Sequence, residues 1–566
     1  MKKYLFLIAA AAFALYACGQ KEPDVTPDVS VNPTELNAVA AGETLELTVT
    51  SNTDWALNTS ANWISFEPAK GNGNGKVSVT VAENTSTKER TDKVTISCSA
   101  KRVTVNVKQA AAEKPEVQKV TSIKTAEDFV AFANSEYEAT ETVTLDANIT
   151  ISEPAPVLTC IFDGKGNTIT LNLEDKTGCT AESPELADIG IFRKVSGKVK
   201  DLKTAGSISN SSEGLEYTYH IGGIAGYATE TAVFENCTNG INLFADKFNT
   251  HHLGGIVGFT EPGVTLTGCK NTGKIETYYT ETSGAKASQL GGIIGHLEGS
   301  GVVTSCTNEG EISYFGAGTV RMGGIVGYVN YAVSATFKDC SNSGALKNDA
   351  TGYSSTKWSY QGGIVGYYGT PNDNSAILYE NCSNSGAIST NAAGTKLRVR
   401  IGGIAGILGN AAAVTEYKNC SNSGDLTLTN GSAGRVQLGG IIGYAEKAGT
   451  FSIKDCSNSG SISSDGKGSV ATDGIAGIVG SGGDASSSFT NVTVAPSTKL
   501  TMAADGIARL IVVGDVPYKT AVTGKVAGTI TVGEAPVEIT ADNYSSWLFC
   551  AALGESGSAS GVTFGN

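Results

Sequence analysis

The sequence predicts an all-β protein in which an Ig-like β-sandwich is followed by a parallel β-helix with a short N-terminal capping helix. Three observations lead to this fold class. The phrase Gly-Gly-Ile-x-Gly recurs through the second half of the chain, and period-two alternation marks strands within residues 29–110. One amphipathic helical segment lies between these parts. A unit that recurs at intervals of roughly 20–50 residues is typical of a solenoid.

Composition favours many short strands over packed helices. The chain has 566 residues, which is too long for one compact core, and contains 70 Gly but only 3 Met and 4 His. Its formal net charge of −14 argues against nucleic acid and anionic lipid headgroups as partners, because both are bound by basic surfaces. Twelve cysteines are too few for a disulfide-built scaffold of this length.

Residues 1–17 are expected to be a signal peptide, because two lysines precede an apolar stretch too short to span a bilayer. The sequence Leu-Tyr-Ala-Cys ending at Cys18 resembles a bacterial lipobox. The resemblance implies cleavage before Cys18 and its lipidation; an ordinary signal peptide is the alternative. Residues 18–28 form a flexible tether whose charges resemble surface-export signals of Gram-negative gut anaerobes. We therefore expect a lipid anchor in the outer membrane, with the protein facing the cell exterior.

Residues 29–110 alternate between apolar and polar positions in four stretches, which predicts a β-sandwich. The segments NTDWAL at 52–57, ANWISFEPAKGNGNG at 61–75, VAENTSTKERTDKVTIS at 81–97 and VTVNVKQ at 103–109 resemble the BACON domain family. That resemblance implies an Ig-like fold and a proposed carbohydrate-binding role, although many members look like spacers. Trp55 and Trp63 could stack against a sugar, but packing in the core is the favoured interpretation.

Residues 111–120 are a linker, and residues 122–134 form the best predicted helix. Thr125 can cap this helix, and two acidic residues occupy its first turn. A solenoid needs such a cap because its end otherwise exposes core residues. The domain that follows is expected to span residues 121–485, and residues 486–566 to form the last coils and a C-terminal cap.

Three positions of the repeat are expected to stack along the β-helix. One coil, residues 290–327, is expected to contain three strands, the first from Leu290 to His296. The expected core ladder is Ile224, Ile256, Ile293, Ile325, Ile364, Ile404, Ile441 and Ile475. The expected turn ladder is Asn239, Asn271, Asn308, Asn342, Asn384, Asn422 and Asn458, whose amides can bond to each other as in cross-β stacks.

Cysteines precede each of these asparagines by two residues, at Cys237, Cys269, Cys306, Cys340, Cys382, Cys420 and Cys456. Zinc binding is disfavoured because no Cys-x₂₋₄-Cys pairs occur, and disulfides because parallel side chains have poor torsions for the bond. Buried free thiols are the favoured interpretation. The whole phrase resembles the GLUG repeat of bacterial surface adhesins, which implies a β-solenoid without catalytic residues.

Aromatic residues supply the candidate ligand contacts. The residue directly after each Gly-Ile-x-Gly phrase is usually aromatic, and we call this series the aromatic file. Its aromatic members are expected to pack beneath neighbouring turns. The series is Tyr227, Phe259, His296, Tyr328, Tyr367, Ile407, Tyr444 and Ile478. Length-variable segments carry the preferred candidates, Tyr278, Tyr279, Tyr314, Phe315, Trp358 and Tyr360, because such segments form loops on one side of a solenoid.

The leading hypothesis is a non-catalytic surface lipoprotein that binds a glycan or a host surface protein. The alternatives are a structural display element and, third, a β-helix polysaccharide lyase or hydrolase. Glycoside hydrolysis needs two carboxylates at a defined separation, and no recurrent pair of acidic residues is present. No metal or cofactor signature appears either, so no catalytic residue, metal or cofactor is assigned.

Overall fold

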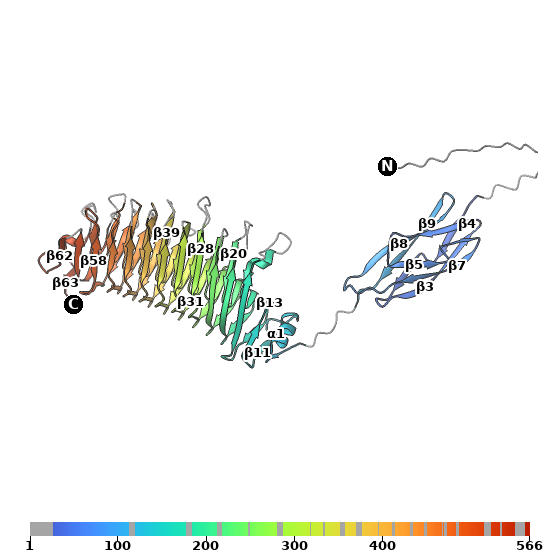
Figure 1. Cartoon of the computed structure of the whole chain (residues 1–566), viewed down its shortest axis with the longest axis horizontal. Helices are drawn as coiled ribbons and strands as arrows, with labels where there is room; N and C mark the ends of the chain where they lie inside the picture. Colours follow the sequence, from blue (N-terminus) through green and yellow to red (C-terminus); the bar gives the residue numbers. More distant parts are fainter. Residues whose placement is uncertain are drawn as a thin grey trace, which may run out of the picture. The chain divides into compact units, whose positions relative to one another are not determined.

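A computed structural model gives the architecture of the chain (Figure 1). It divides into two compact units, residues 1–118 and 119–566. The structure describes residues 26–565 except for 113–118, 177–183, 212–217, 247–249, 280–286, 317, 332–333, 351–356, 370–375, 394–395, 410–413, 431–433, 447–449, 467, 469–472, 483–485, 514–521, 533–534 and 550–560. No helix within these ranges is long and apolar enough to cross a membrane.

The first unit is a β-sandwich, as the alternation predicts. Its four-stranded sheet has the order β1 (Val29–Asn32), β3 (Glu43–Ser51), β7 (Gly75–Val81) and β5 (Ile64–Glu67). Its five-stranded sheet has the order β2 (Glu35–Ala38), β9 (Lys101–Gln109), β8 (Arg90–Cys98), β4 (Asp54–Asn58) and β6 (Lys70–Asn72). Alternate residues of both sheets, such as Val79 and Val105, are fully buried in one core, as expected for sheets packed face to face.

The second unit is a parallel β-solenoid built from four sheets, which we number I to IV (Figure 1). Sheet I contains β16 (Asp188–Ile189), β20 (Thr218–Gly222), β24 (Thr250–Gly254), β29 (Ala287–Gly291), β34 (Thr319–Gly323), β39 (Trp358–Gly362), β44 (Arg398–Gly402), β49 (Val436–Gly439), β54 (Gly474–Ala476) and β59 (Ala508–Arg509). Sheet II contains β13 (Ala155–Leu158), β17 (Phe192–Val195), β21 (Ala225–Ala228), β25 (Val257–Thr260), β30 (Ile294–Glu298), β35 (Val326–Asn330), β40 (Val365–Tyr368), β45 (Ala405–Leu408), β50 (Ile442–Ala445) and β55 (Val479–Gly482).

The other two sheets are longer. Sheet III contains β10 (Ser122–Ile123), β11 (Thr142–Leu145), β14 (Ile161–Asp163), β18 (Lys198–Lys200), β22 (Val233–Glu235), β26 (Thr265–Thr267), β31 (Gly301–Thr304), β36 (Ser334–Lys338), β41 (Ala376–Glu380), β46 (Val414–Lys418), β51 (Thr450–Lys454) and β56 (Ser486–Thr490). Sheet IV contains β12 (Ile149–Ile151), β15 (Thr168–Asp175), β19 (Lys203–Asn210), β23 (Thr238–Ala245), β27 (Lys270–Asn271), β28 (Ile275–Tyr279), β32 (Thr307–Asn308), β33 (Ile312–Gly316), β37 (Ser341–Asn342), β38 (Leu346–Asp349), β42 (Ser383–Asn384), β43 (Ile388–Asn391), β47 (Ser421–Asn422), β48 (Leu426–Thr429), β52 (Ser457–Asn458), β53 (Ile462–Ser464), β57 (Val492–Val494), β58 (Lys499–Met502), β60 (Thr523–Val526), β61 (Thr529–Val532), β62 (Ala535–Glu538) and β63 (Gly561–Phe564).

Each coil, or rung, has more strands than the sequence predicts. The segment expected to be one strand, Leu290 to His296, is split between β29 in sheet I and β30 in sheet II. The chain bends between these strands at Gly292 and Ile293. Five short strands in four sheets therefore replace the three expected, because the Gly-Gly-Ile phrase is itself a corner and not part of a strand.

The register corrects the alignment of the last repeat. Ile441 lies beside Ile478, since its backbone N–H donates to the Ile478 carbonyl at 2.8 Å. Ile475, expected in the core ladder, instead pairs with Leu438 of sheet I. The phrase of this rung is thus residues 476–480, and Ser481, not Ile478, lies beside Tyr444.

Both ends of the solenoid core are covered. Helix α1 (Ala126–Ala133) has Thr125 as its N-cap, with a capping box to Asp128, and buries Phe129 and Phe132. This confirms the helix and its Thr125 cap, but Ser122–Ile123, which were expected to begin the helix, form strand β10 of sheet III. At the other end, β62 pairs antiparallel with β61, and the 3₁₀ helix η2 (Tyr544–Trp547) packs partly buried side chains against the last rungs. A second 3₁₀ helix, η1 (Pro184–Ala187), precedes β16.

Candidate functional site

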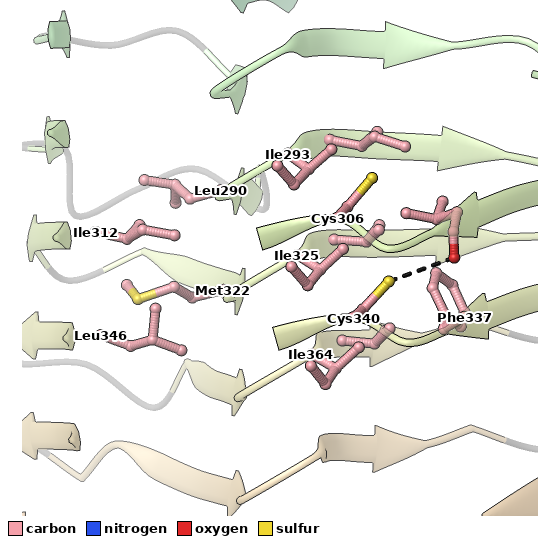
Figure 2. Packing of buried hydrophobic residues seen from close by; sticks show 14 of the residues in the cluster. Leu290, Ile293, Cys306, Ile312, Met322, Ile325, Phe337, Cys340, Leu346 and Ile364 are labelled. Carbon is pink, nitrogen blue, oxygen red and sulfur yellow. Dashed lines mark hydrogen bonds between the residues drawn. The ribbon is translucent and has the colours of Figure 1, made fainter. Parts of the chain in front are cut away.

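The repeated isoleucines and cysteines form the interior of the solenoid (Figure 2). Ile256, Ile293 and Ile325 are fully buried, and so are Cys269, Cys306 and Cys340. All nine described cysteines are free, as expected, and thiols of the ladder donate to backbone carbonyls; Cys340, for example, donates to Val303 at 3.3 Å. Burial raises the pKa of the Cys237 thiol well above its usual value. These thiols are therefore core residues rather than nucleophiles.

The asparagine ladder is a continuous chain of buried amides. Asn308 accepts a hydrogen bond from Nδ2 of Asn271 and donates to Oδ1 of Asn342, both at 2.8 Å. Nδ2 of Asn308 also donates to the carbonyl of Gly310 at 2.9 Å. The amide that closes the turn is thus bonded to the rungs before and after it, as the sequence predicts.

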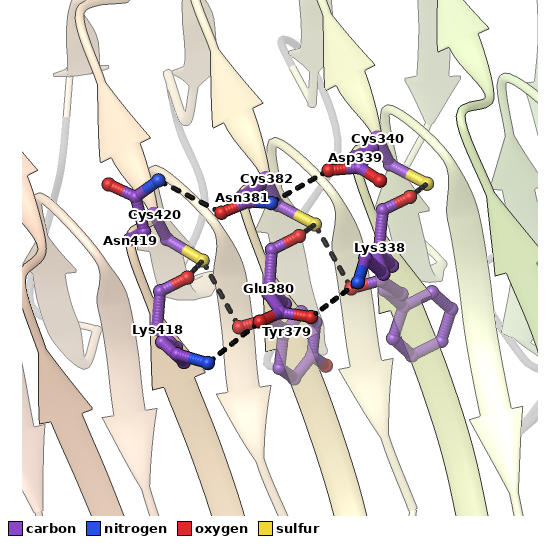
Figure 3. Close-up of polar contacts among 11 residues, drawn as sticks. Lys338, Asp339, Cys340, Tyr379, Glu380, Asn381, Cys382, Lys418, Asn419 and Cys420 are labelled. Atoms are coloured by element: carbon purple, nitrogen blue, oxygen red, sulfur yellow. Dashed lines mark hydrogen bonds and ion pairs between the residues drawn. The ribbon is translucent and has the colours of Figure 1, made fainter.

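A second polar ladder, formed by residues that precede several of the cysteines, was not anticipated from the sequence (Figure 3). Asp339, Asn381 and Asn419 have positive φ angles of 54°, 54° and 52°, and their side chains bond from rung to rung at 2.8–2.9 Å. Asn and Asp tolerate this left-handed conformation better than other non-Gly residues. Their recurrence before Cys was the available signal. Beside them, Lys418 and Lys338 bond to Glu380 and lower its pKa to about 2.

The Gly-Gly-Ile corner brings the outer faces of sheets I and II against each other. A Cβ at Gly258 would collide with the backbone of Ile221 on the preceding rung, so the two sheets meet backbone to backbone. Side chains beyond this contact form two facing columns, which we call the seam. Sheet I contributes His220, His252, Gln289, Arg321, Tyr360, Arg400 and Gln437, and sheet II contributes Tyr227, Phe259, His296, Tyr328, Tyr367, Ile407 and Tyr444.

Seam residues pack across the corner rather than beneath turns, which corrects the expectation for the aromatic file. The ring centroids of His220 and Phe259 are 4.8 Å apart, and the Arg400 guanidinium lies 3.8 Å from the Tyr444 ring centroid. Burial lowers the pKa of His252 well below its usual value, and it also lowers that of His296 although Glu298 bonds to it. The seam is a second packed layer outside the main core.

Three of the six preferred aromatic candidates are buried. Tyr279 and Tyr314 are 2% and 1% exposed and lie on strands β28 and β33, not on loops. Tyr360, at 7% exposed, is part of the seam. The expectation that these three side chains face a ligand on an exposed loop is wrong on position, because strand alternation points Tyr279 and Tyr314 inward with Ile275 and Ile312.

The other three candidates, Tyr278, Phe315 and Trp358, are exposed or half-buried. Tyr278 is 37% exposed, but its ring stacks on Phe315 with centroids 4.5 Å apart and planes 11° apart, so that face is occupied. Trp358 is half-buried beside Tyr360, with the Arg398 and Arg400 guanidinium carbons 4.9 and 4.3 Å from its ring centroid. The sequence did not indicate that these arginines meet Trp358, because they belong to the next rung.

The N-terminal unit has a concavity on the outer face of its five-stranded sheet. Its volume is about 700 Å³, and it is lined by Asn58, Thr59, Ser60, Thr91, Asp92, Lys93, Thr95, Asn106 and Lys108. Trp55 is buried in the core, with its Nε1 donating to Gly73 at 2.7 Å, and Trp63 packs under the Arg90 guanidinium. Polar side chains, not the tryptophans, therefore define this surface.

Some histidines of the described ranges pair with carboxylates, as His220 does with Asp188 at 2.7 Å. No group of three or more His, Cys, Asp or Glu side chains there is placed to hold a metal ion. The seam carboxylate Glu298 binds His296 at 2.8 Å and Asn330 at 3.0 Å. These contacts are structural in character. The predicted lipidation site, Cys18, lies outside the described residues.

Comparison with known proteins agrees with both expected resemblances. The family model of the BACON domain, described as "Putative binding domain, N-terminal", matches residues 53–110. The GLUG motif matches residues 286–313 and 434–463, each of which covers a corner and the following Cys-x-Asn turn. The chain therefore combines a BACON domain with GLUG motifs on a β-solenoid. A search of curated proteins finds no match.

Two solved structures are similar to parts of the chain. A Bacteroides ovatus GH5 xyloglucanase in complex with a XXXG heptasaccharide is 16% identical, with 25% of this chain and 46% of that chain covered and a TM-score of 0.15. WR4, a C. elegans MSP family member, is 18% identical, with 15% of this chain and 97% of that chain covered and a TM-score of 0.13. This chain thus spans about half of the first structure, and neither likeness supports an argument about fold or function.

Proposed function

We propose that this protein is a non-catalytic surface lipoprotein that binds carbohydrate through the outer face of its N-terminal five-stranded sheet. One observation carries the proposal, namely the polar concavity of about 700 Å³ on that face. Lys93 and Asn106 lie opposite each other on β8 and β9, and both are exposed. Amide, hydroxyl and ammonium groups on a rigid sheet suit the hydroxyl groups of a sugar, and the matched binding-domain family agrees with this role.

In this proposal a lipid on Cys18 anchors the protein in the outer membrane, and the solenoid faces the cell exterior. The proposal assigns no cofactor and no nucleic-acid partner. A host surface glycoprotein is the partner class expected of an adhesin. Globomycin, which inhibits the lipoprotein signal peptidase, should cause the unprocessed precursor to accumulate. If globomycin leaves the processing of the precursor unchanged, or if a Cys18→Ala variant is still processed, lipid anchoring at Cys18 is refuted.

A glycan array probed with residues 19–566 tests the binding function. The double variant Lys93→Ala, Asn106→Ala should lose at least about tenfold in affinity, because a hydrogen bond to a charged group contributes roughly 1.5–3 kcal/mol. Lys76→Ala is the matched control, since Lys76 is also an exposed lysine of this domain but lies on the other sheet. Equal binding by the double variant would refute the assigned surface, and no binding to any glycan would refute the function.

A display role is the second candidate, and the continuous amide ladder favours it, because rung-to-rung bonds make a stiff rod. It predicts that the solenoid can be shortened by whole rungs without loss of glycan binding. Catalysis is tested separately by incubation with acidic polysaccharides and a reducing-end assay, for which we expect no product. New reducing ends that increase with enzyme concentration would instead establish a lyase or hydrolase.

A further inference from the structure

Two arginines of the following rung, Arg398 and Arg400, lie over the ring of Trp358 at the edge of the seam, in a chain of net charge −14. Trp358 and Arg398 begin β39 and β44 and lie opposite each other in sheet I. Arg435 follows in the adjoining rung, since its carbonyl accepts a hydrogen bond from the backbone N–H of Val399 at 2.8 Å. This column therefore places one tryptophan and two arginines on three consecutive rungs, whose strands lie about 4.8 Å apart.

The three arginines near Trp358 differ in how far their charge is neutralised. Arg435 donates to the buried carboxylate of Asp473 at 2.7 Å. Arg400 is only 4% exposed, donates to Gln437 at 2.7 Å, and its contact with Glu446 is longer, at 3.4 Å. Arg398 is exposed, and within the described ranges its contact is the Trp358 ring rather than a carboxylate.

We propose that Trp358, Arg398 and Arg400 form a binding site for an anionic sugar residue, a uronate or a sulfated hexose, within a polysaccharide. The planar guanidinium of Arg398 can donate two parallel hydrogen bonds to a carboxylate or sulfate group. The indole supplies a large and rigid apolar surface for the sugar ring beside it. Arg400 holds the indole from within the seam, so that the site is organised before the ligand arrives.

The charge count favours a polysaccharide over a nucleic acid or a membrane. Arg398 is the exposed and unneutralised cation of the cluster, whereas Arg400 is buried and contacts Glu446, so the site can pair with one anionic group. Nucleic acid carries a charge on each nucleotide and is bound by neutralising many phosphates at once. A site with one exposed and unneutralised cation instead fits the single carboxylate or sulfate group of one sugar residue.

This site lies on the solenoid and goes beyond the sugar-binding face proposed for the N-terminal domain. The test uses residues 19–566, which retain every described residue, and measures affinity for polygalacturonate, dextran sulfate and neutral dextran by isothermal titration calorimetry. We expect binding to at least one polyanion, weakened by salt, and none to neutral dextran. The preferred polyanion then distinguishes a carboxylate from a sulfate ligand.

Variants locate the site. Arg398→Ala should weaken polyanion binding by about tenfold or more, because it removes charge-assisted hydrogen bonds. Arg398→Lys should recover only part of it, since a lysine keeps the charge but not the planar fork. Trp358→Ala should also weaken binding. Lys454→Ala, at an exposed cation of sheet III, is the matched control and should bind normally, as should the N-terminal Lys93→Ala, Asn106→Ala variant.

The far-ultraviolet circular dichroism of each variant establishes that it is folded. Arg398→Ala that is folded and binds polyanions like the unaltered protein would overturn the proposal. Equal binding to neutral dextran would overturn it too. Tighter binding to double-stranded DNA or to phosphatidylserine vesicles than to either polysaccharide would assign the patch to a different class of partner and refute the sugar.

Discussion

The amide ladder offers the sharpest test of how the solenoid is held together, through the variant Asn308→Ala. This change removes three hydrogen bonds of 2.8–2.9 Å that join Asn308 to Asn271, Gly310 and Asn342. It leaves one N–H and two carbonyl oxygens without partners at a fully buried site. At roughly 1–2 kcal/mol for each buried group left unpaired, the loss should be about 3–6 kcal/mol.

Urea denaturation of residues 119–566, which have their own core, measures this loss by circular dichroism. Thr307→Ala is the matched control on the same strand, because its half-buried hydroxyl makes one contact of 3.1 Å with Ser341. Thr307→Ala should lower the free energy of unfolding by less than about 1.5 kcal/mol. If Asn308→Ala costs no more than Thr307→Ala, the ladder does not stabilise the fold as we argue.

The pH dependence of folding should follow the buried histidines. His251 is fully buried, and burial lowers its pKa to about 4 from 6.5, so the unfolded chain binds more protons between these values. Stability should therefore fall as the pH decreases from 6.5 towards 4, and His251→Leu should weaken that dependence; an unchanged curve would contradict it. Gly258→Ala should cost more than about 1 kcal/mol in urea denaturation, since its Cβ would collide with the Ile221 backbone, and a neutral effect would refute the backbone contact. The cysteine ladder should not react with Ellman's reagent in the native protein and should react fully in urea; fast reaction of several native thiols would show that they are accessible.

Core positions were predictable because a solenoid stacks equivalent residues, so repetition alone identifies them. An isoleucine equivalent to Ile293 recurs in each phrase, and Cys306 and Asn308 belong to a Cys-x-Asn motif of constant spacing; the structure places all three in the ladders expected for them. Ile475 is the residue that the sequence placed in the wrong ladder. Residues 473–477 match the phrase as well as residues 476–480 do, and only the neighbouring rung decides that Ile478 and not Ile475 continues the ladder.

The candidate ligand residues were less predictable, for two physical reasons. Tyr279 and Tyr314 lie in segments of variable length, but each is an even number of residues from a core isoleucine on the same strand. Their side chains therefore point to the same buried face as that isoleucine, whatever the length of the segment. The Trp358 cluster depends on register between rungs, because Trp358 and Arg398 are 40 residues apart and the length of the intervening repeat is not constant. The seam depends on how sharply the corner bends, which no spacing in the sequence encodes.

The corner also explains why variation gathers at the seam. Inside the main core, a column such as Ile256, Ile293 and Ile325 admits one shape and no charge, because each member is enclosed by its neighbours. Seam side chains pack on one another in a separate layer outside that core, and its sheet I column contains His, Gln, Arg and Tyr in turn. A charged residue can therefore occupy a seam position without disrupting the fold of the rung. The Gly-Gly-Ile-x-Gly phrase carries no ligand contact of its own, yet it creates the surface on which an unneutralised arginine can lie beside a tryptophan.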